Sequence, residues 1–175
     1  MDTQTITLPK TQTLIYYYAL VSVSFLIPLF VTGPQLLTGA IVNAFLFLSV
    51  YSFNKKQILP IIVLPSIGAV LNGVLFGTFT PFLLYFMPFI WIGNYILTTV
   101  FASMIKKNSF ISSLFISSFS KSALLFLIAY LYIGGHLVPP IFLKAMGVFQ
   151  LVTALVGGVL ALAINKLIKK NYDRP

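Results

Sequence analysis

The sequence predicts an all-α, polytopic membrane protein with six transmembrane helices and both termini in the cytoplasm. Hydrophobic residues make up 59% of the chain and charged residues only 7%, whereas soluble domains carry roughly 25% charged residues. The mean hydropathy is +1.02. Such a chain has too few polar groups to cover a surface in water. We therefore expect residues 1–175 to form one integral domain in the cell membrane.

Six apolar segments support this expectation, each near the roughly 20 residues that a helix needs to cross a bilayer. We expect helices at about 14–31, 36–53, 58–76, 81–105, 109–133 and 137–168. The last segment is longer than a membrane requires, which predicts a tilted helix or an interfacial end. Prolines inside three segments predict kinks that free a backbone carbonyl one turn earlier: Pro28, Pro60, Pro65 and Pro88.

Basic turns alternate with uncharged turns along the chain. It has 11 Lys and Arg against 2 Asp and Glu, and the acids lie near the ends, at Asp2 and Asp173. Nine of the bases lie before the first segment, at the even-to-odd junctions or near the end of the chain: Lys10, Lys55, Lys56, Lys106, Lys107, Lys166, Lys169, Lys170 and Arg174. The positive-inside rule then predicts that both termini and the basic loops are cytoplasmic. Because short basic loops are typical of this topology, we expect no nucleic-acid partner.

Several kinds of chemistry lack the residues they need. The chain has no cysteine, which excludes thiolate catalysis and cysteine-ligated zinc or iron–sulfur centres. Its predicted membrane segments hold no carboxylate, so the acidic clusters of metal-dependent membrane enzymes are missing. The single histidine, His136, lies in a turn without a nucleophile motif nearby. We expect no enzymatic activity, no cofactor and no metal.

Lys121 is the most informative residue, because it lies in the middle of the 109–133 segment. A lysine at the centre of a membrane helix costs about 3 kcal/mol on insertion scales. The surrounding sequence is Ser117-Ser118-Phe119-Ser120-Lys121-Ser122. No carboxylate in the predicted segments can pair with it. Three alternatives remain for Lys121: a ligand supplies the negative charge, another subunit supplies it, or the amine is neutral and needs none.

Other polar side chains in the predicted segments gather toward the outer half, which indicates a cavity that opens outward. Lys121 and Lys144 are candidates for contact with a ligand carboxylate or phosphate. Trp91 is a candidate for stacking on the ligand, and hydrogen bonds are predicted from the amide side chains of Asn43, Asn72, Asn94 and Gln150. Two simpler roles remain open: Asn43 and Asn72 as contacts between helices, and Lys144 as a side chain that reaches the surface.

The architecture resembles the substrate-binding S component of energy-coupling factor (ECF) transporters. The likeness rests on six helices in fewer than 200 residues, cytoplasmic termini, the outward polar cluster, and the stretches 33–39 and 150–158. The resemblance implies a subunit that captures a vitamin-like solute, while a transmembrane coupling subunit and two cytoplasmic ATPases drive transport. We expect a small organic, anionic solute. The alternative is a non-catalytic anchoring or structural subunit of another membrane complex, such as a redox complex.

Overall fold

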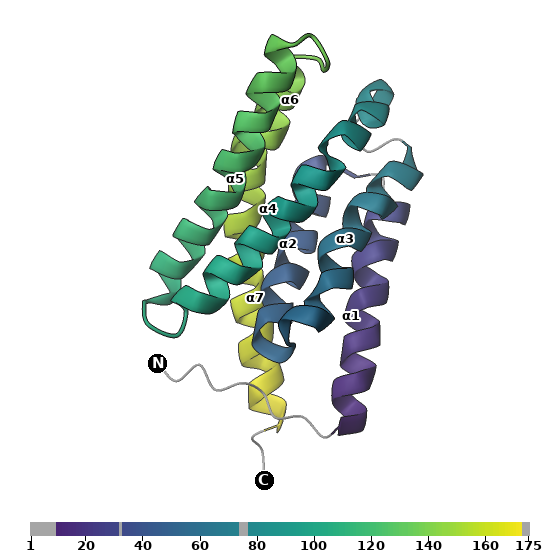
Figure 1. The fold of residues 1–175 in the computed structure, drawn as a ribbon. Coiled ribbons are helices and arrows are strands. Elements are labelled where there is room, and N and C mark those ends of the chain that lie inside the picture. Colours follow the sequence, from purple (N-terminus) through teal and green to yellow (C-terminus); the bar gives the residue numbers. More distant parts are fainter. Residues whose placement is uncertain (1–9, 32, 74–76, 173–175) are drawn as a thin grey trace.

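A computed structural model describes residues 10–31, 33–73 and 77–172, and helices are the only regular structure in these ranges (Figure 1). The all-α class is therefore confirmed. The elements are α1 (Lys10–Phe30), α2 (Gln35–Ser52), α3 (Lys55–Asn72), the 3-10 helix η1 (Gly77–Phe82), α4 (Leu83–Met104), α5 (Phe110–Gly134), α6 (Ile141–Met146) and α7 (Val148–Tyr172). Residues 74–76 of the third predicted segment, together with Asp2, Asp173 and Arg174, lie outside the described residues.

Five helical segments of the described chain are long and apolar enough to cross a membrane. They are Thr11–Phe30, Gln35–Ser52, Thr78–Met104, Phe110–Gly134 and Ile141–Ile168. This number indicates a multi-pass membrane protein. The sixth long helix, α3, has 18 residues, begins with Lys55 and Lys56, and contains two prolines. It does not belong to the five, so the count of six spans stays a prediction.

The predicted helix at 137–168 is divided in two. α6 ends at Met146, and Gly147 has φ −97° and ψ −98°, which are not helical angles. A Cβ at Gly147 would lie 2.8 Å from the Leu143 carbonyl oxygen and from the Phe126 ring, so the break is packed too tightly for a side chain. The hydroxyl of Ser122 donates to the Gly147 carbonyl at 3.0 Å. The apolar sequence continues through this point, and hydropathy alone could not reveal the break.

The ends of α3 follow local capping chemistry. Asn54 accepts from the backbone N–H groups of Lys56 and Gln57, and the Gln57 side chain accepts from the Asn54 N–H, which forms a capping box. The helix therefore begins three residues before the predicted 58. It ends at Asn72, and the next residue, Gly73, has a φ of +73°, a left-handed conformation that favours glycine.

Small residues let the closest helix pairs approach each other. The most extensive packing joins α2 to α7, α1 to α3, and α4 to α5. A Cβ at Gly157 of α7 would lie 2.6 Å from the Ala40 carbonyl oxygen and 2.7 Å from the Ala44 nitrogen, both on α2. These distances are shorter than non-bonded contacts allow. Only glycine permits the two backbones to lie this close.

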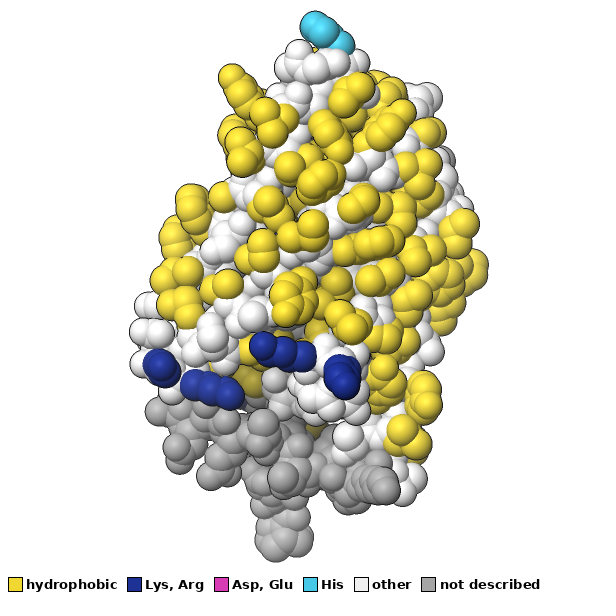
Figure 2. Space-filling view, in the orientation of Figure 1, with side chains coloured by type: hydrophobic (Ala, Val, Ile, Leu, Met, Phe, Trp, Pro, Cys, Tyr) yellow, Lys and Arg dark blue, Asp and Glu magenta, His cyan; other side chains and the backbone are white. Residues whose placement is uncertain are grey.

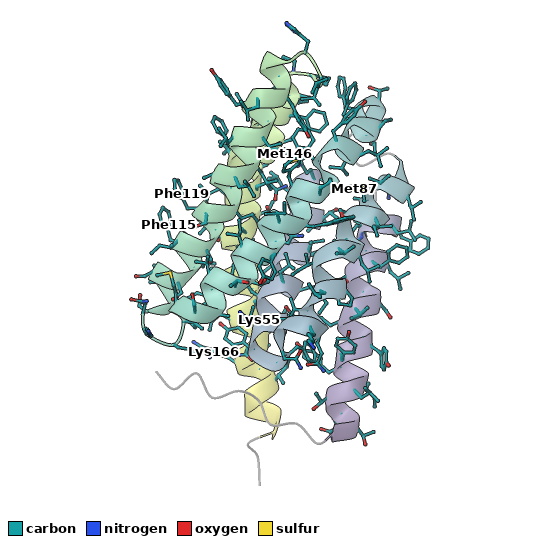
Figure 3. All side chains as sticks on the ribbon, viewed as in Figure 1. Lys55, Met87, Phe115, Phe119, Met146 and Lys166 are labelled. Atoms are coloured by element: carbon teal, nitrogen blue, oxygen red, sulfur yellow. The ribbon has the colours of Figure 1, made fainter. Side chains whose placement is uncertain are left out.

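The two kinds of turn lie at opposite ends of the bundle. Figure 2 shows lysines gathered at one end of the visible face, His136 at the other, and a largely hydrophobic wall between them. Lys55 and Lys166 are labelled near the basic end in Figure 3. α1 begins and α7 ends at this same end (Figure 1). The charge alternation of the sequence therefore becomes an asymmetry along the long axis of the protein.

The buried core consists of two apolar clusters at different heights. One contains Phe47, Ile61, Leu97 and Phe101 with their neighbours. The other contains Ala69, Phe86, Leu125, Phe142 and Met146. Along α4 and α5, the buried residues between the clusters include Asn94 and Lys121. Buried polar side chains therefore lie between the two apolar clusters.

The contact at Gly157 generates a stability prediction. Gly157→Ala should destabilise the protein by about 1–3 kcal/mol, the usual cost of overpacking, because the added Cβ meets the α2 backbone. The melting temperature in detergent should fall by at least about 2 °C. Gly134→Ala is the matched control, since a Cβ there has no atom within 4 Å. Equal melting temperatures for the two variants would contradict the close α2–α7 approach.

Candidate functional site

The candidate site is a layer of buried polar side chains between the two apolar clusters. We call Thr38, Asn43, Ser66, Asn94, Lys121 and Thr153 the polar layer. Lys121 is only 3% exposed, although it carries the longest of these side chains. It lies 11 residues after the first residue of α5 and 13 before the last. With a rise of 1.5 Å per residue, it lies about 17 Å along the helix.

The amine of Lys121 is held by one amide. Its Nζ donates to Oδ1 of Asn43 at 2.7 Å. Asn43 is 2% exposed and uses its other end as well: Nδ2 donates to the Gly39 carbonyl at 2.9 Å and to Oγ1 of Thr153 at 3.1 Å. With two acceptors at Nδ2 and a donor at Oδ1, the amide orientation is determined. Asn43 therefore joins α2, α5 and α7 at one point.

A glycine on α4 makes room for the stem of Lys121. A Cβ at Gly93 would lie 3.3 Å from Cγ of Lys121, closer than most Cβ contacts, and 3.6 Å from Leu125. The methylene chain of the lysine therefore crosses the face of α4 where that helix has no side chain. Gly93 and Asn43 together direct the amine inward, away from the lipid-facing surface.

No acidic residue balances Lys121 in residues 10–31, 33–73 and 77–172, because these ranges contain neither Asp nor Glu. An ammonium group has three N–H donors, and the structure pairs one of them with Asn43. A buried charge is stable only when paired and hydrogen-bonded. The site therefore favours an anionic partner for the lysine, or a neutral amine.

A cavity of about 90 Å³ adjoins the amine. Residues from all seven α-helices line it. They are Pro28, Gln35, Thr38, Gly39, Val42, Asn43, Pro65, Ser66, Ala69, Leu83, Ile90, Asn94, Lys121, Met146 and Gln150. Pro28 is near the end of α1, Gln35 starts α2 and Met146 ends α6. The cavity therefore lies in the half of the bundle away from the basic end, where Figure 3 labels Met146.

Two buried polar atoms at this cavity have no hydrogen-bond partner among the described residues. They are Oγ1 of Thr38 and Oδ1 of Asn94. Nδ2 of Asn94 donates to the Ile62 carbonyl at 3.0 Å, which anchors the side chain to α3. Buried polar atoms are nearly always paired, and an unpaired one costs about 1–3 kcal/mol. A ligand with a hydrogen-bond donor group near Asn94 would remove this cost.

The layer as a whole suits one kind of ligand. Lys121 offers N–H donors to an anionic oxygen, Thr38 offers a hydroxyl, and Asn94 offers an acceptor. Apolar side chains such as Val42, Leu83 and Ile90 form most of the remaining wall, together with Gln35, Ser66 and Gln150. The arrangement is complementary to a carboxylate or phosphate that carries a nearby hydroxyl or amino group. It lacks groups of metal-binding residues, since no cluster of His, Cys, Asp or Glu occurs in the described part of the chain.

The structure brings together four of the seven residues predicted for the site: Lys121, Asn43, Asn94 and Gln150 all line the cavity. The other three lie elsewhere. Trp91 Nε1 donates to Oγ of Ser66 at 2.7 Å, which places the indole behind a lining residue. Asn72 Nδ2 donates to the Leu29 carbonyl at 2.8 Å and joins α3 to α1.

Lys144 belongs to α6 and is exposed. Its Nζ lies 5.2 Å from the centroid of the Phe149 ring, which is a cation–π contact. The side chain therefore points away from the cavity that Lys121 faces. The structure thus provides one lysine at the site instead of the pair considered from the sequence.

Sequence reasoning missed Gln35, Thr38 and Ser66 as lining residues. A signal was present on α2, where Gln35, Thr38 and Val42 recur at helical spacing and share a face with Gly39 and Asn43. The side chain of Gln35 also donates to the Ala145 carbonyl at 3.3 Å, so it connects α2 to α6 at the rim of the cavity.

The Lys121–Asn43 contact predicts thermodynamic coupling. Asn43→Ala should destabilise the protein, because it leaves the buried Lys121 amine without its acceptor, and this loss should be smaller when Lys121→Met is also present. Hydrogen bonds between membrane helices contribute about 0.5–2 kcal/mol, so we expect a coupling energy of about 1–2 kcal/mol. SDS titration in mixed micelles measures the four free energies of unfolding.

A second cycle provides the control. Lys107 is exposed at the basic end, so Lys107→Met combined with Asn43→Ala should give additive effects. Additive effects for the Lys121 pair as well would show that the buried hydrogen bond is not formed in the folded protein.

Comparisons with protein-family models, curated proteins and solved structures find no match for this chain.

Proposed function

We propose that this chain is the substrate-binding membrane subunit of an ECF-type uptake transporter, and that Lys121 holds the anionic group of a small organic solute. The proposal rests on one observation. A lysine that is 3% exposed faces a cavity, with no acidic residue in the described ranges to balance it. A solute that supplies the negative charge would complete the site.

The size of the cavity limits the part of the solute that it encloses. Pockets for drug-sized ligands have volumes of about 300–1,000 Å³, whereas this cavity has about 90 Å³. A carboxylate or phosphate with an adjacent polar group fits this volume. The rest of a vitamin-like solute would extend past Gln35 and Gln150, which are partly exposed at the rim.

The charge asymmetry supports a direction of capture. The positive-inside rule assigns the basic end and both termini to the cytoplasm, with six spans in the cell membrane. The cavity then lies in the outer half of the membrane, where it could receive a solute from outside. Proton-coupled carriers usually relay protons through buried carboxylates or histidines. Since the spans have no carboxylate, we propose that a coupling subunit and cytoplasmic ATPases supply the energy, and that the chain is not an enzyme.

The anchoring-subunit alternative requires an acid on a partner helix to reach Lys121. The amine points into its own bundle and bonds to Asn43 of α2, which argues against such a pair. Co-purification distinguishes the two: ATPases and a membrane coupling subunit support the transporter subunit, whereas other partners support the alternative.

The proposal predicts that a bound solute depends on Lys121. Native mass spectrometry of the purified protein should detect an anionic small molecule, and Lys121→Met should weaken its binding at least about tenfold, the value of one charge-assisted hydrogen bond. Lys144→Met is the matched control and should bind normally, because Lys144 is exposed outside the cavity. Unchanged binding by Lys121→Met, in protein that inserts and purifies normally, would rule out this role.

The absence of cysteine makes the topology directly testable. We expect Lys107→Cys to be protected from a membrane-impermeant maleimide in intact cells, and His136→Cys to be labelled. Both positions are exposed, so accessibility reports the side of the membrane. After permeabilisation both should react. If only Lys107→Cys were labelled in intact cells, the protein would have the opposite orientation.

A further inference from the structure

A second cavity, of about 380 Å³, opens at the basic end between α2, α3 and α4. It shares no lining residue with the cavity beside Lys121. Two lysines line it, Lys55 at the start of α3 and Lys106 just after α4. Lys55 is labelled near the basic end in Figure 3. The function proposed above does not use this cavity.

The mouth of this cavity favours an anion for two independent reasons. Lys55 begins α3 and Lys106 follows the end of α4; both are exposed, and the described part of the chain has no acid to neutralise them. Lys55 is also the first residue of α3, so the positive end of the helix dipole lies at the same place. Exposed lysines keep their hydration, and they can therefore attract an anion without the cost that Lys121 meets.

The interior of the cavity has the opposite character. Six of the eleven other lining residues are apolar: Val50, Phe53, Ile58, Ile62, Ala102 and Ile105. The remaining five, which carry polar groups, are Tyr51, Asn54, Tyr95, Thr98 and Thr99. A free phosphate ion has no hydrocarbon part that could contact the apolar side chains. An anionic amphiphile would match both parts, with its charge at the mouth and a hydrocarbon chain inside.

We propose that this cavity binds an anionic phospholipid, with the headgroup phosphate between Lys55 and Lys106 and an acyl chain along Ile58, Ile62 and Ala102. The bilayer supplies such molecules at the depth of the basic end, where Figure 2 shows lysines beyond the apolar wall. Basic pockets between membrane helices on the cytoplasmic side are suited to anionic headgroups. The lipid would bridge α3 and α4 at their basic ends.

Native mass spectrometry of the delipidated full-length protein tests the proposal. Phosphatidylglycerol should bind more tightly than phosphatidylcholine with the same acyl chains. Lys55→Gln combined with Lys106→Gln should weaken phosphatidylglycerol binding about 30-fold, because each lysine near an anionic lipid contributes a factor of about five. The matched control is Lys56→Gln with Lys107→Gln, which removes the same charge from adjacent positions that do not line the cavity.

Two further arms separate the parts of the site. Ala102→Phe keeps both lysines but fills the apolar interior, so it should also weaken phosphatidylglycerol binding. Glycerol 3-phosphate, which has the phosphate without acyl chains, should bind far more weakly than the lipid. Equal loss in the control pair, equal binding of the two lipids, or equal binding of glycerol 3-phosphate and phosphatidylglycerol would each overturn the proposal.

Discussion

The hydrogen bond between Lys121 and Asn43 joins α5 to α2 in the middle of the bundle. It is 2.7 Å long and lies where the surrounding chain supplies no negative charge. An amide oxygen replaces only part of the hydration that an ammonium group loses, so the cost of burial is reduced but not removed. The apolar clusters on either side must supply the compensating free energy. The polar layer is therefore a feature that the fold tolerates at a net cost, as is common for functional sites in membranes.

Close helix packing makes that hydrogen bond possible. A Cβ at Gly157 would lie 2.7 Å from Cβ of Asn43, so the glycine permits both the approach of α7 to α2 and the position of the asparagine. Thr153, one turn earlier on α7, then accepts from Asn43 at 3.1 Å. On the other side, Gly93 accommodates the stem of Lys121. Small residues thus set the helix spacing, and the spacing sets the geometry of the polar contacts.

The sequence was sufficient to predict the class, because hydropathy and helix length are properties of single segments. The same holds for Lys121, Asn43 and Asn94, since a polar residue in the middle of an apolar segment must face the protein interior. Trp91 and Asn72 were different. The sequence shows on which helix face each one lies, but not which neighbouring helix it contacts. Trp91 bonds to Ser66 and Asn72 bonds to the Leu29 carbonyl, and both contacts depend on packing between segments. The break at Gly147 also arises from tertiary contacts, with Ser122 and Phe126.

The two cavities show how the depth of a cation determines the ligand that suits it. Lys121 is buried, so it favours a ligand group that leaves water completely and also satisfies Thr38 and Asn94. Lys55 and Lys106 remain exposed, so they favour a ligand that stays at the interface and enters the protein only with its apolar part. α2, α3 and α4 line both cavities. The spacing of these helices therefore affects the shape of both cavities.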